Sequence, residues 1–331
     1  MNASEPLLRV ENLRVELTTR QGISPVIDDV SFTLGAGECM SLVGESGCGK
    51  SMTALALMGL VPHPVGRIAS GRILFNGEDL VQASEARMRE IRGNDISMIF
   101  QEPMTSLNPV YTVGEQIAEV LRRHQGLTRR QAWSQAVELL NDVGIPDPGA
   151  RVAAYPHQMS GGQRQRVMIA MALACAPKIL IADEPTTALD VTVQAQIFDL
   201  LGVLRRETGT AILLITHDMG AVAEMAERMM VMYAGRKAEE GPVDQVIAAP
   251  RHPYTKGLIS CVPHVMETLT QERQTLMEIP GIVPPLGQFG ADRCLFAARC
   301  ALANAQCAGA RPGDMSFAGE QHSACWHAEA V

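Results

Sequence analysis

The chain has 331 residues, of which 47% are hydrophobic and 19% charged, and its formal net charge is −8. This length accommodates one large domain and a smaller one, and the apolar fraction is ample for a buried core, which excludes a disordered chain. The surplus of acid argues against a nucleic-acid partner, because such proteins need a basic face to contact phosphates.

No stretch of the sequence is typical of a membrane span. The most apolar run, residues 167–177, is far shorter than the ~20 residues that a bilayer-spanning helix needs. The N-terminus mixes charged residues with short apolar runs, unlike a signal peptide. We therefore expect the chain in the cytosol, with its eight cysteines as thiols or metal ligands and not as disulfides.

The elements expected in chain order alternate between strands and helices. Period-two patterns or short apolar runs predict strands at residues 10–17, 39–43, 72–75, 96–100, 179–182, 211–215 and 229–233. Helical spacing predicts helices at residues 52–60, from the capping box of Thr128 and Gln131 to Gly144, at 161–176, and from the cap Asp190 to Gly209. An Asn76-Gly77 turn ends the third strand.

This alternation predicts an α/β fold with a mainly parallel sheet and a nucleotide at the carboxyl edge of its strands. Near Pro250 the content of Pro, Gly and Cys rises and long periodic runs stop. We predict a domain boundary between about residues 250 and 263. The expected domains are a cassette at residues 1–255, with a helical subdomain at about 94–175, and a small loop-rich extension at residues 256–331.

A glycine-rich loop follows the strand at residues 39–43 and fits the P-loop pattern G-x-x-x-x-G-K-[ST]. Its glycines let backbone amides turn toward phosphates, and the helix N-terminus adds a favourable potential. Lys50 is expected to reach the β- and γ-phosphates and Ser51 to bind Mg²⁺. Because the run lies between a predicted strand and a predicted helix, a chance glycine-rich turn is disfavoured. The expected nucleotide-binding residues are Gly44, Glu45, Ser46, Gly47, Cys48, Gly49, Lys50, Ser51 and Met52.

An acidic pair, Asp183 and Glu184, ends the strand at residues 179–182. Asp183 is placed to join the magnesium shell, and Glu184 to polarise the attacking water. An acidic pair after a strand is often only a helix cap. With a P-loop upstream, it predicts the second half of an NTPase site.

A second glycine pair begins the helix at residue 161, where Ser160, Gly161, Gly162 and Gln163 follow Met159. Exposed amides and a hydroxyl at a helix N-terminus suit a γ-phosphate. The run resembles the signature of ABC ATPases. This resemblance implies an ABC-type P-loop ATPase fold with an antiparallel β part, in which the signature contacts the nucleotide of the opposite subunit.

Further elements resemble the ABC family in the same order along the chain. The resemblance implies that Gln101 is the Q-loop glutamine, that residues 188–190 are the D-loop with Asp190 at the dimer seam, and that His217 is the switch histidine. It implies Glu184, His217 and Gln101 as catalytic residues, ATP as substrate, and Mg²⁺ held by Ser51, Gln101 and Asp183. One position departs from the family: Leu17 stands where an aromatic residue usually stacks on adenine.

Residues 101–109, 250–255 and 279–281 resemble the ATP-binding subunits of oligopeptide, dipeptide and nickel importers. This resemblance implies a homologous second ATP-binding subunit, two membrane permease subunits and a periplasmic or extracellular solute-binding protein, at the cytoplasmic face of the bacterial inner membrane. Residues 103–113 are the expected docking surface for a permease, with an ordinary loop as the alternative. The other components select the solute, so peptide, nickel, glycoside and opine import all remain open.

Two other classes of function are weighed against a transport motor. A soluble ABC ATPase acting on ribosomes or DNA usually needs two cassettes in one chain or a long coiled coil, and this chain has one cassette and no heptad run. An iron–sulfur sensor that uses ATP only as a ligand would not need Glu184 and His217.

Four cysteines cluster in the extension, and we call them the extension cysteines: Cys294, Cys300, Cys307 and Cys325. A segment this short, with few large side chains, is expected to need a cross-link. Zinc sites usually contain a close C-x₂₋₄-C pair, which is absent, whereas four thiolates on a loop-rich scaffold suit an iron–sulfur cluster. Some members of the importer family that resemble this sequence carry a [4Fe–4S] cluster. Zinc, with His322 and His327 as spare ligands, and free thiols remain alternatives.

Overall fold

The computed structural model describes residues 5–20, 22–101, 106–187, 189–261 and 278–331. The chain forms two compact units. Unit 1 comprises Met1–Leu7, Leu34–Cys39 and Gln82–Ile215, and unit 2 comprises Leu8–Thr33, Met40–Val81 and Thr216–Val331. The division into a cassette and an extension remains a prediction.

Unit 1 contains a parallel sheet of three buried strands, β6 (Ile96–Ile99), β7 (Ile179–Asp183) and β8 (Ala211–Ile215). β7 pairs in parallel with both neighbours. Nearly every side chain in these strands is apolar and buried, as expected where both faces of a sheet are covered. The predicted strands at 179–182 and 211–215 are confirmed, and their carboxyl ends lie at one edge.

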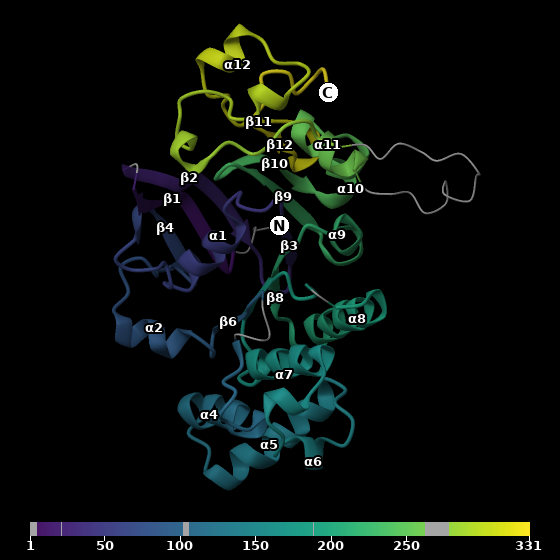
Figure 1. Cartoon of the computed structure of the whole chain (residues 1–331). Helices are drawn as coiled ribbons and strands as arrows, with labels where there is room; N and C mark the ends of the chain where they lie inside the picture. The colour runs from purple at the N-terminus through teal and green to yellow at the C-terminus, as the bar shows by residue number, and fades with distance from the viewer. Residues whose placement is uncertain (1–4, 21, 102–105, 188, 262–277) are drawn as a thin grey trace, which may run out of the picture. The chain divides into compact units, whose positions relative to one another are not determined.

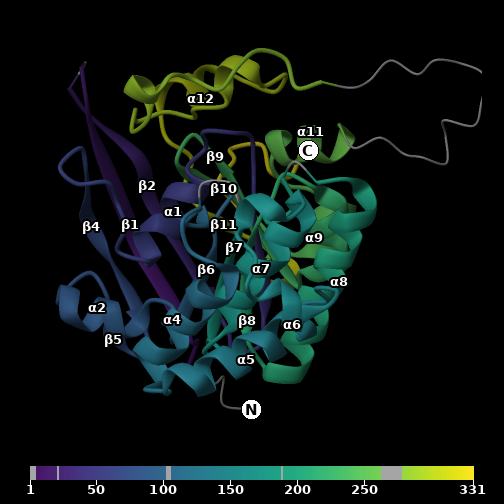
Figure 2. The same cartoon turned by 60° about the horizontal axis from the view of Figure 1, so that its bottom comes forward.

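Helices make up the rest of unit 1, and Figures 1 and 2 both show α4 to α7 gathered in one group. The helical elements are α2 (Glu85–Ile91), α4 (Val113–Gln125), α5 (Arg129–Asp142), α6 (Pro148–Arg151), η1 (Pro156–Gln158), α7 (Gly161–Leu173) and α8 (Val191–Thr208). The capping box of Thr128 and Gln131 is confirmed at the start of α5. Asp190 caps α8 as predicted, by accepting from Val193 N–H at 2.9 Å.

Unit 2 begins with an antiparallel sheet in the order β2 (Gly22–Leu34), β1 (Leu8–Thr19), β4 (Gly66–Phe75) and β5 (Glu78–Asp79). The long strands lie side by side in Figure 2. The predicted Asn76-Gly77 turn is confirmed, with φ of +48° and +82°. Sequence analysis did not predict β2, because Pro25 and the pair Asp28-Asp29 interrupt its apolar pattern.

The remaining strands of unit 2 form a second ladder. β3 (Cys39–Val43) pairs in parallel with β9 (Arg228–Tyr233), and β9 pairs antiparallel with β10 (Arg236–Pro242). From the extension, β12 (His322–Ser323) pairs with β10, and β11 (Met315–Ser316) pairs with β12. The helical elements are α1 (Lys50–Leu57), α9 (Met219–Met225), α10 (Val243–Ala248), α11 (Pro253–Ser260), η3 (Leu286–Gln288), η4 (Ala297–Arg299), α12 (Ala305–Gly309) and η5 (Ala318–Glu320).

The extension shares a hydrophobic core with the strands of unit 2. Phe289 and Phe296 are buried in one cluster with Tyr233 and Tyr254. The ring of Phe296 meets Tyr233 edge-on, with centroids 5.2 Å apart, a favourable aromatic geometry. The extension therefore has a source of stability other than the cross-link expected from its composition.

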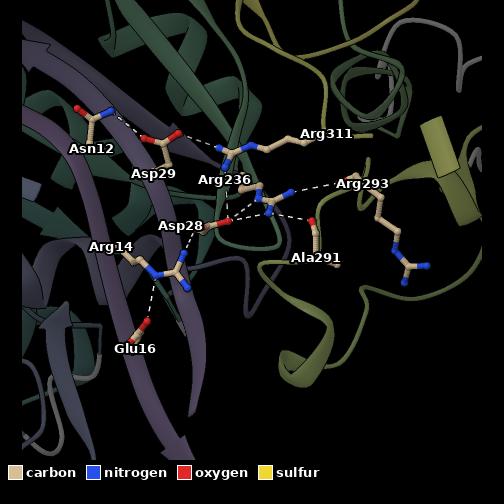
Figure 3. Close-up of polar contacts among 9 residues, drawn as sticks. All are labelled: Asn12, Arg14, Glu16, Asp28, Asp29, Arg236, Ala291, Arg293 and Arg311. Carbon is tan, nitrogen blue, oxygen red and sulfur yellow. Dashed lines mark hydrogen bonds and ion pairs between the residues drawn. The ribbon is translucent and has the colours of Figure 1, made fainter. Parts of the chain in front are cut away.

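A buried carboxylate, Asp28 of β2, joins the antiparallel sheet to the extension (Figure 3). Its side chain is 5% exposed and accepts from Arg14 at 2.7 Å and from Arg236 at 2.8 Å. The guanidinium of Arg236 also donates to the carbonyls of Ala291 and Arg293 in the extension. Because a buried charge is costly unless it is paired, these parts stabilise one another.

No helix in the parts of the chain that the structure describes has the length and apolar character needed to span a bilayer.

We predict that Asp28→Asn lowers the free energy of unfolding of unit 2 by roughly 3 kcal/mol, because it leaves Arg236 buried without its ionic partner. Urea unfolding is followed by the fluorescence of Trp326 in a Trp133→Phe background, so that the signal comes from the extension. Asp29→Asn is the matched control: its side chain is 47% exposed, and asparagine tolerates the backbone φ of +65°. Equal unfolding free energies for the two variants would contradict the role of Asp28.

Candidate functional site

The glycines of the loop after β3 are required by packing and by backbone geometry. Gly44 has φ +151°, and a Cβ there would clash with the carbonyl oxygen of Met232. Gly49, the cap of α1, has φ +106°, and a Cβ there would lie 3.0 Å from the Val26 carbonyl. Only glycine adopts these conformations without strain.

The lysine of this loop is buried and bound to the loop itself. Lys50 Nζ donates to the carbonyl of Gly44 at 2.6 Å and to the carbonyl of Glu45 at 3.2 Å. Cys48, itself a residue of the loop, is buried, and burial raises the pKa of its thiol, so that it is a neutral packing residue at pH 7. The structure thus holds a cation at the first turn of a helix, the arrangement that suits an oligophosphate.

A cavity of about 310 Å³ opens beside the loop. It brings His217 together with Gly44 and Glu45, and its other lining residues are Val43, Asp218, Met219, Leu258 and Cys261. Asp218, next to His217, caps α9 by accepting from Gly220 N–H at 2.8 Å. Sequence analysis placed His217 at the nucleotide, but it missed the contribution of α11, because no local pattern links Leu258 and Cys261 to a loop two hundred residues away.

Within unit 1, the acidic pair lies at the end of β7. Asp183 is buried, and Glu184 adopts φ +46°, a conformation that is rare for residues other than glycine and often marks a functional site. Gln101 Nε2 donates to Glu184 Oε2 at 3.0 Å, and Thr187 Oγ1 donates to the same oxygen at 2.9 Å. Two donors on one oxygen fix the carboxylate. The sequence pointed to Gln101 and Glu184 separately but gave no signal for Thr187.

The glycine pair at residues 161–162 begins α7. Ser160 Oγ accepts from Gln163 N–H at 3.3 Å, and Gln163 Oε1 accepts from Ser160 N–H at 3.1 Å, which completes a capping box. Ser160 and Gly161 are exposed. Of the expected D-loop, Asp190 is an exposed helix cap, and residue 188 lies outside the described part of the chain.

The expected docking surface lies partly outside the described residues, since residues 103–105 are not among them. Its described part contains Val110 and Tyr111, which are 72% and 53% exposed. The buried Gln116 holds this loop, because its amide nitrogen donates to the carbonyls of Asn108 and Tyr111 at 3.1 Å. Asn108 and Tyr111 also line a cavity of about 780 Å³ beside α4. An apolar, fixed loop beside a cavity is suited to a partner.

The extension cysteines do not form a ligand set for a single ion. Among the residues that the structure describes, no three His, Cys, Asp or Glu side chains lie close enough together to hold one. Backbone amides nevertheless donate to the sulfurs: Leu302 N–H to Cys300 Sγ and His327 N–H to Cys325 Sγ, each at 3.3 Å. Burial raises the pKa of Cys300 and raises that of Cys325 to about 11.

Two protein families match the chain. The ABC transporter family matches residues 27–187. The oligopeptide/dipeptide transporter C-terminal region matches residues 238–307. The second match includes three of the four extension cysteines.

Close relatives resemble nearly the whole chain. A putative peptide import ATP-binding protein of Brucella abortus (strain 2308) is 51% identical over 315 residues, which cover 93% of each chain. The dipeptide transport ATP-binding protein DppD of Bacillus subtilis (strain 168) is 48% identical over 322 residues, or 97% of this chain and 95% of the relative.

Solved structures of ATP-binding cassettes also resemble this chain. The ATP-binding cassette MJ0796, in a dimeric post-hydrolysis state bound to ADP and Pi, has a TM-score of 0.65 at 27% identity, covering 71% of this chain and 98% of that one. CbiO1 of Clostridium perfringens, part of an ABC transporter complex, has a TM-score of 0.62 at 27% identity. The match covers 74% of this chain and 92% of that one. The chain therefore belongs to the ABC transporter family, as an ATP-hydrolysing subunit of its oligopeptide/dipeptide branch.

Proposed function

We propose that this chain hydrolyses ATP to drive the import of a peptide-like solute through an ABC transporter. The observation that carries the proposal is the presence in one chain of an ABC cassette and an oligopeptide/dipeptide C-terminal region. Relatives that resemble nearly the full length are named for peptide or dipeptide import. These names favour a peptide over nickel, opine or glycoside.

In this proposal the motifs supply different parts of the chemistry. Lys50 and the amides of residues 44–52 bind the phosphates of ATP. Glu184, held by Gln101 and Thr187, orients and polarises the attacking water. Ser51, Gln101 and Asp183 would hold Mg²⁺, which would neutralise charge on the phosphates. His217, which shares a cavity with Gly44, contacts the γ-phosphate.

The signature residues are proposed to act on a nucleotide bound by another cassette. Ser160 and Gly161 are exposed at the start of α7, where amides and a hydroxyl can meet a γ-phosphate. A homologous second ATP-binding subunit would supply the matching signature, and two permeases would dock near Tyr111. The chain would then lie peripherally at the cytoplasmic face of the inner membrane, with a solute-binding protein outside.

Glu184→Gln is predicted to lower kcat about 10²- to 10⁴-fold while the Kd for ATP stays within about twofold, because only the water-activating charge is lost. Lys50→Ala should instead weaken ATP binding itself. Phosphate release and nucleotide affinity are measured on the assembled transporter, with Glu207→Gln, an exposed glutamate of α8, as the matched control. Near-normal turnover by Glu184→Gln would mean that another group activates the water.

The purified chain alone is expected to be a poor ATPase, since each site needs a signature from a second cassette. Reconstitution with the homologous subunit and the permeases should raise the turnover number markedly. Tyr111→Asp should preserve ATP affinity but lose this stimulation, because it places a charge on the proposed docking loop. Full activity of the isolated monomer would argue against the need for a second cassette. Normal stimulation of the Tyr111 variant would argue against the docking loop.

We also propose that the extension cysteines hold a [4Fe–4S] cluster. Amide donors to Cys300 and Cys325 favour the proposal, because such bonds stabilise sulfur ligands that carry negative charge. The backbone brings two of the four residues together, because Cys294 N–H donates to the Cys307 carbonyl at 3.0 Å. The sequence lacks the close C-x₂₋₄-C pair that zinc sites usually contain, which favours a cluster over zinc. Its role would be structural.

Protein purified without air should contain about four irons and four sulfides per chain. Cys300→Ser should lower this content and loosen the extension, seen in the fluorescence of Trp326, before it changes ATP hydrolysis. Cys175→Ser, a change in α7's flanking turn, is the matched control. Stoichiometric zinc without sulfide, or four freely titrating thiols, would refute the cluster.

A further inference from the structure

Two short segments that the proposed function does not use are linked to the nucleotide-binding loop, one directly through Tyr254 and the other through Arg299. They are residues 250–255, which precede and begin α11, and residues 279–281, which precede the cysteine-containing loops. Both lie in unit 2 with the loop. Both connections end at Glu45, the second residue of the loop.

The side chain of Glu45 is bound by an arginine of the extension. Arg299 Nη1 donates to Glu45 Oε2 at 2.6 Å, and Arg299 Nη2 donates to Glu45 Oε1 at 2.9 Å. The arginine side chain is only 4% exposed, whereas that of Glu45 is 30% exposed. A bidentate pair of this kind is both strong and geometrically specific. The hydrogen bonds to Glu45 raise the pKa of Arg299, which is a cation at every physiological pH.

Residues 279–281 hold the arginine in place. Arg299 Nε donates to the Pro280 carbonyl at 2.8 Å, and Nη2 donates to the Ile279 carbonyl at 3.3 Å. Gly281 has φ +76°, and a Cβ there would lie 3.4 Å from Arg299 Cγ, so the backbone can approach the side chain closely. The rings of Tyr233 and Phe296 each lie 5.8 Å from the guanidinium, within cation–π range.

Residues 250–255 hold the backbone of the same glutamate. Tyr254 is fully buried, and its hydroxyl accepts from Glu45 N–H at 2.8 Å. His252 caps α11 by accepting from Tyr254 N–H at 3.1 Å. The buried Glu239 carboxylate accepts from the amides of Arg251 and His252 at 2.7 and 2.9 Å. Glu45 is thus fixed at its amide by α11 and at its carboxylate by the extension.

The charge of the fixed Glu45 side chain affects the electrostatics of the loop. The carbonyls of Gly44 and Glu45 accept from Lys50 Nζ, so the fixed residue also places the lysine. Glu45 is one of the residues that line the cavity beside the loop, and its carboxylate belongs to the second residue of that loop. Paired with Arg299, that carboxylate is neutralised. Unpaired, it would repel the phosphates.

We propose that Arg299 is a positioning residue of the ATP site, which neutralises and holds Glu45 so that the loop binds a triphosphate more tightly. The proposal rests on the assignment of residues 44–52 as the nucleotide-binding loop. It gives the extension a part in ATP binding whether or not the cysteines hold metal.

The test measures the Kd for ATP by calorimetry on the full-length chain. Arg299→Ala should weaken ATP binding about tenfold, and the effect should shrink as salt is added, because screening reduces the repulsion by Glu45. The double variant Arg299→Ala with Glu45→Gln should restore the Kd to within about twofold, since the uncompensated charge is gone. Glu45→Gln alone should lose less ATP affinity than Arg299→Ala does, and Arg299→Lys should bind ATP within about threefold of the parent.

A control separates this charge effect from a loss of structure. Arg293→Ala changes an exposed arginine of the extension that donates to Gln288, and it should keep the parental Kd. If Arg299→Ala does not fold, Arg299→Gln replaces it as the neutral variant.

Several results would overturn the inference. They are an unchanged Kd in the neutral Arg299 variant, no recovery in the double variant, and a loss in Glu45→Gln equal to that in Arg299→Ala. Lys50→Ala distinguishes this failure from failure of the proposed function. If Lys50→Ala abolishes ATP binding and Arg299→Ala does not change it, the nucleotide-binding loop stands and only the role of Arg299 is lost.

Discussion

The pairing of the buried Asp28 carboxylate with Arg14 and Arg236 is the interaction on which the arrangement of unit 2 depends. It joins β1, β2 and β10, and the same Arg236 guanidinium donates to two carbonyls of the extension. A carboxylate in this position cannot lose its partners without a large penalty, so segments separated by more than 200 residues must come together in one cooperative event. The antiparallel sheet and the extension therefore stabilise one another.

This mutual dependence changes how the extension is understood. Its composition suggested a loose segment that a cross-link must hold, yet it contributes Phe289 and Phe296 to a core shared with Tyr233 and Tyr254. From that core Arg299 reaches the nucleotide-binding loop. The family-specific segments at residues 250–255 and 279–281 thus act on the same loop, one through a tyrosine hydroxyl and the other through backbone carbonyls that hold the arginine.

Local signals in the sequence predicted local structure well. The capping box at Thr128, the cap at Asp190 and the apolar strand at residues 179–182 each depend on neighbours within a few positions. The strand β2 could not be predicted, because the charge of Asp28 is tolerated inside the sheet only through arginines that are distant in sequence.

The same limit applies to the site. The sequence indicated Gln101, Glu184 and Glu45 one by one. It could not indicate that Gln101 binds Glu184 across 83 positions, or that Arg299 binds Glu45 across 254.

The hydroxyl of Ser160 can take part in two hydrogen bonds. It accepts from the Gln163 amide, while its own hydrogen remains available for an acceptor on another molecule. In the proposed signature role, one oxygen would therefore cap the helix and also donate to a phosphate, so that phosphate binding would not require the cap to break.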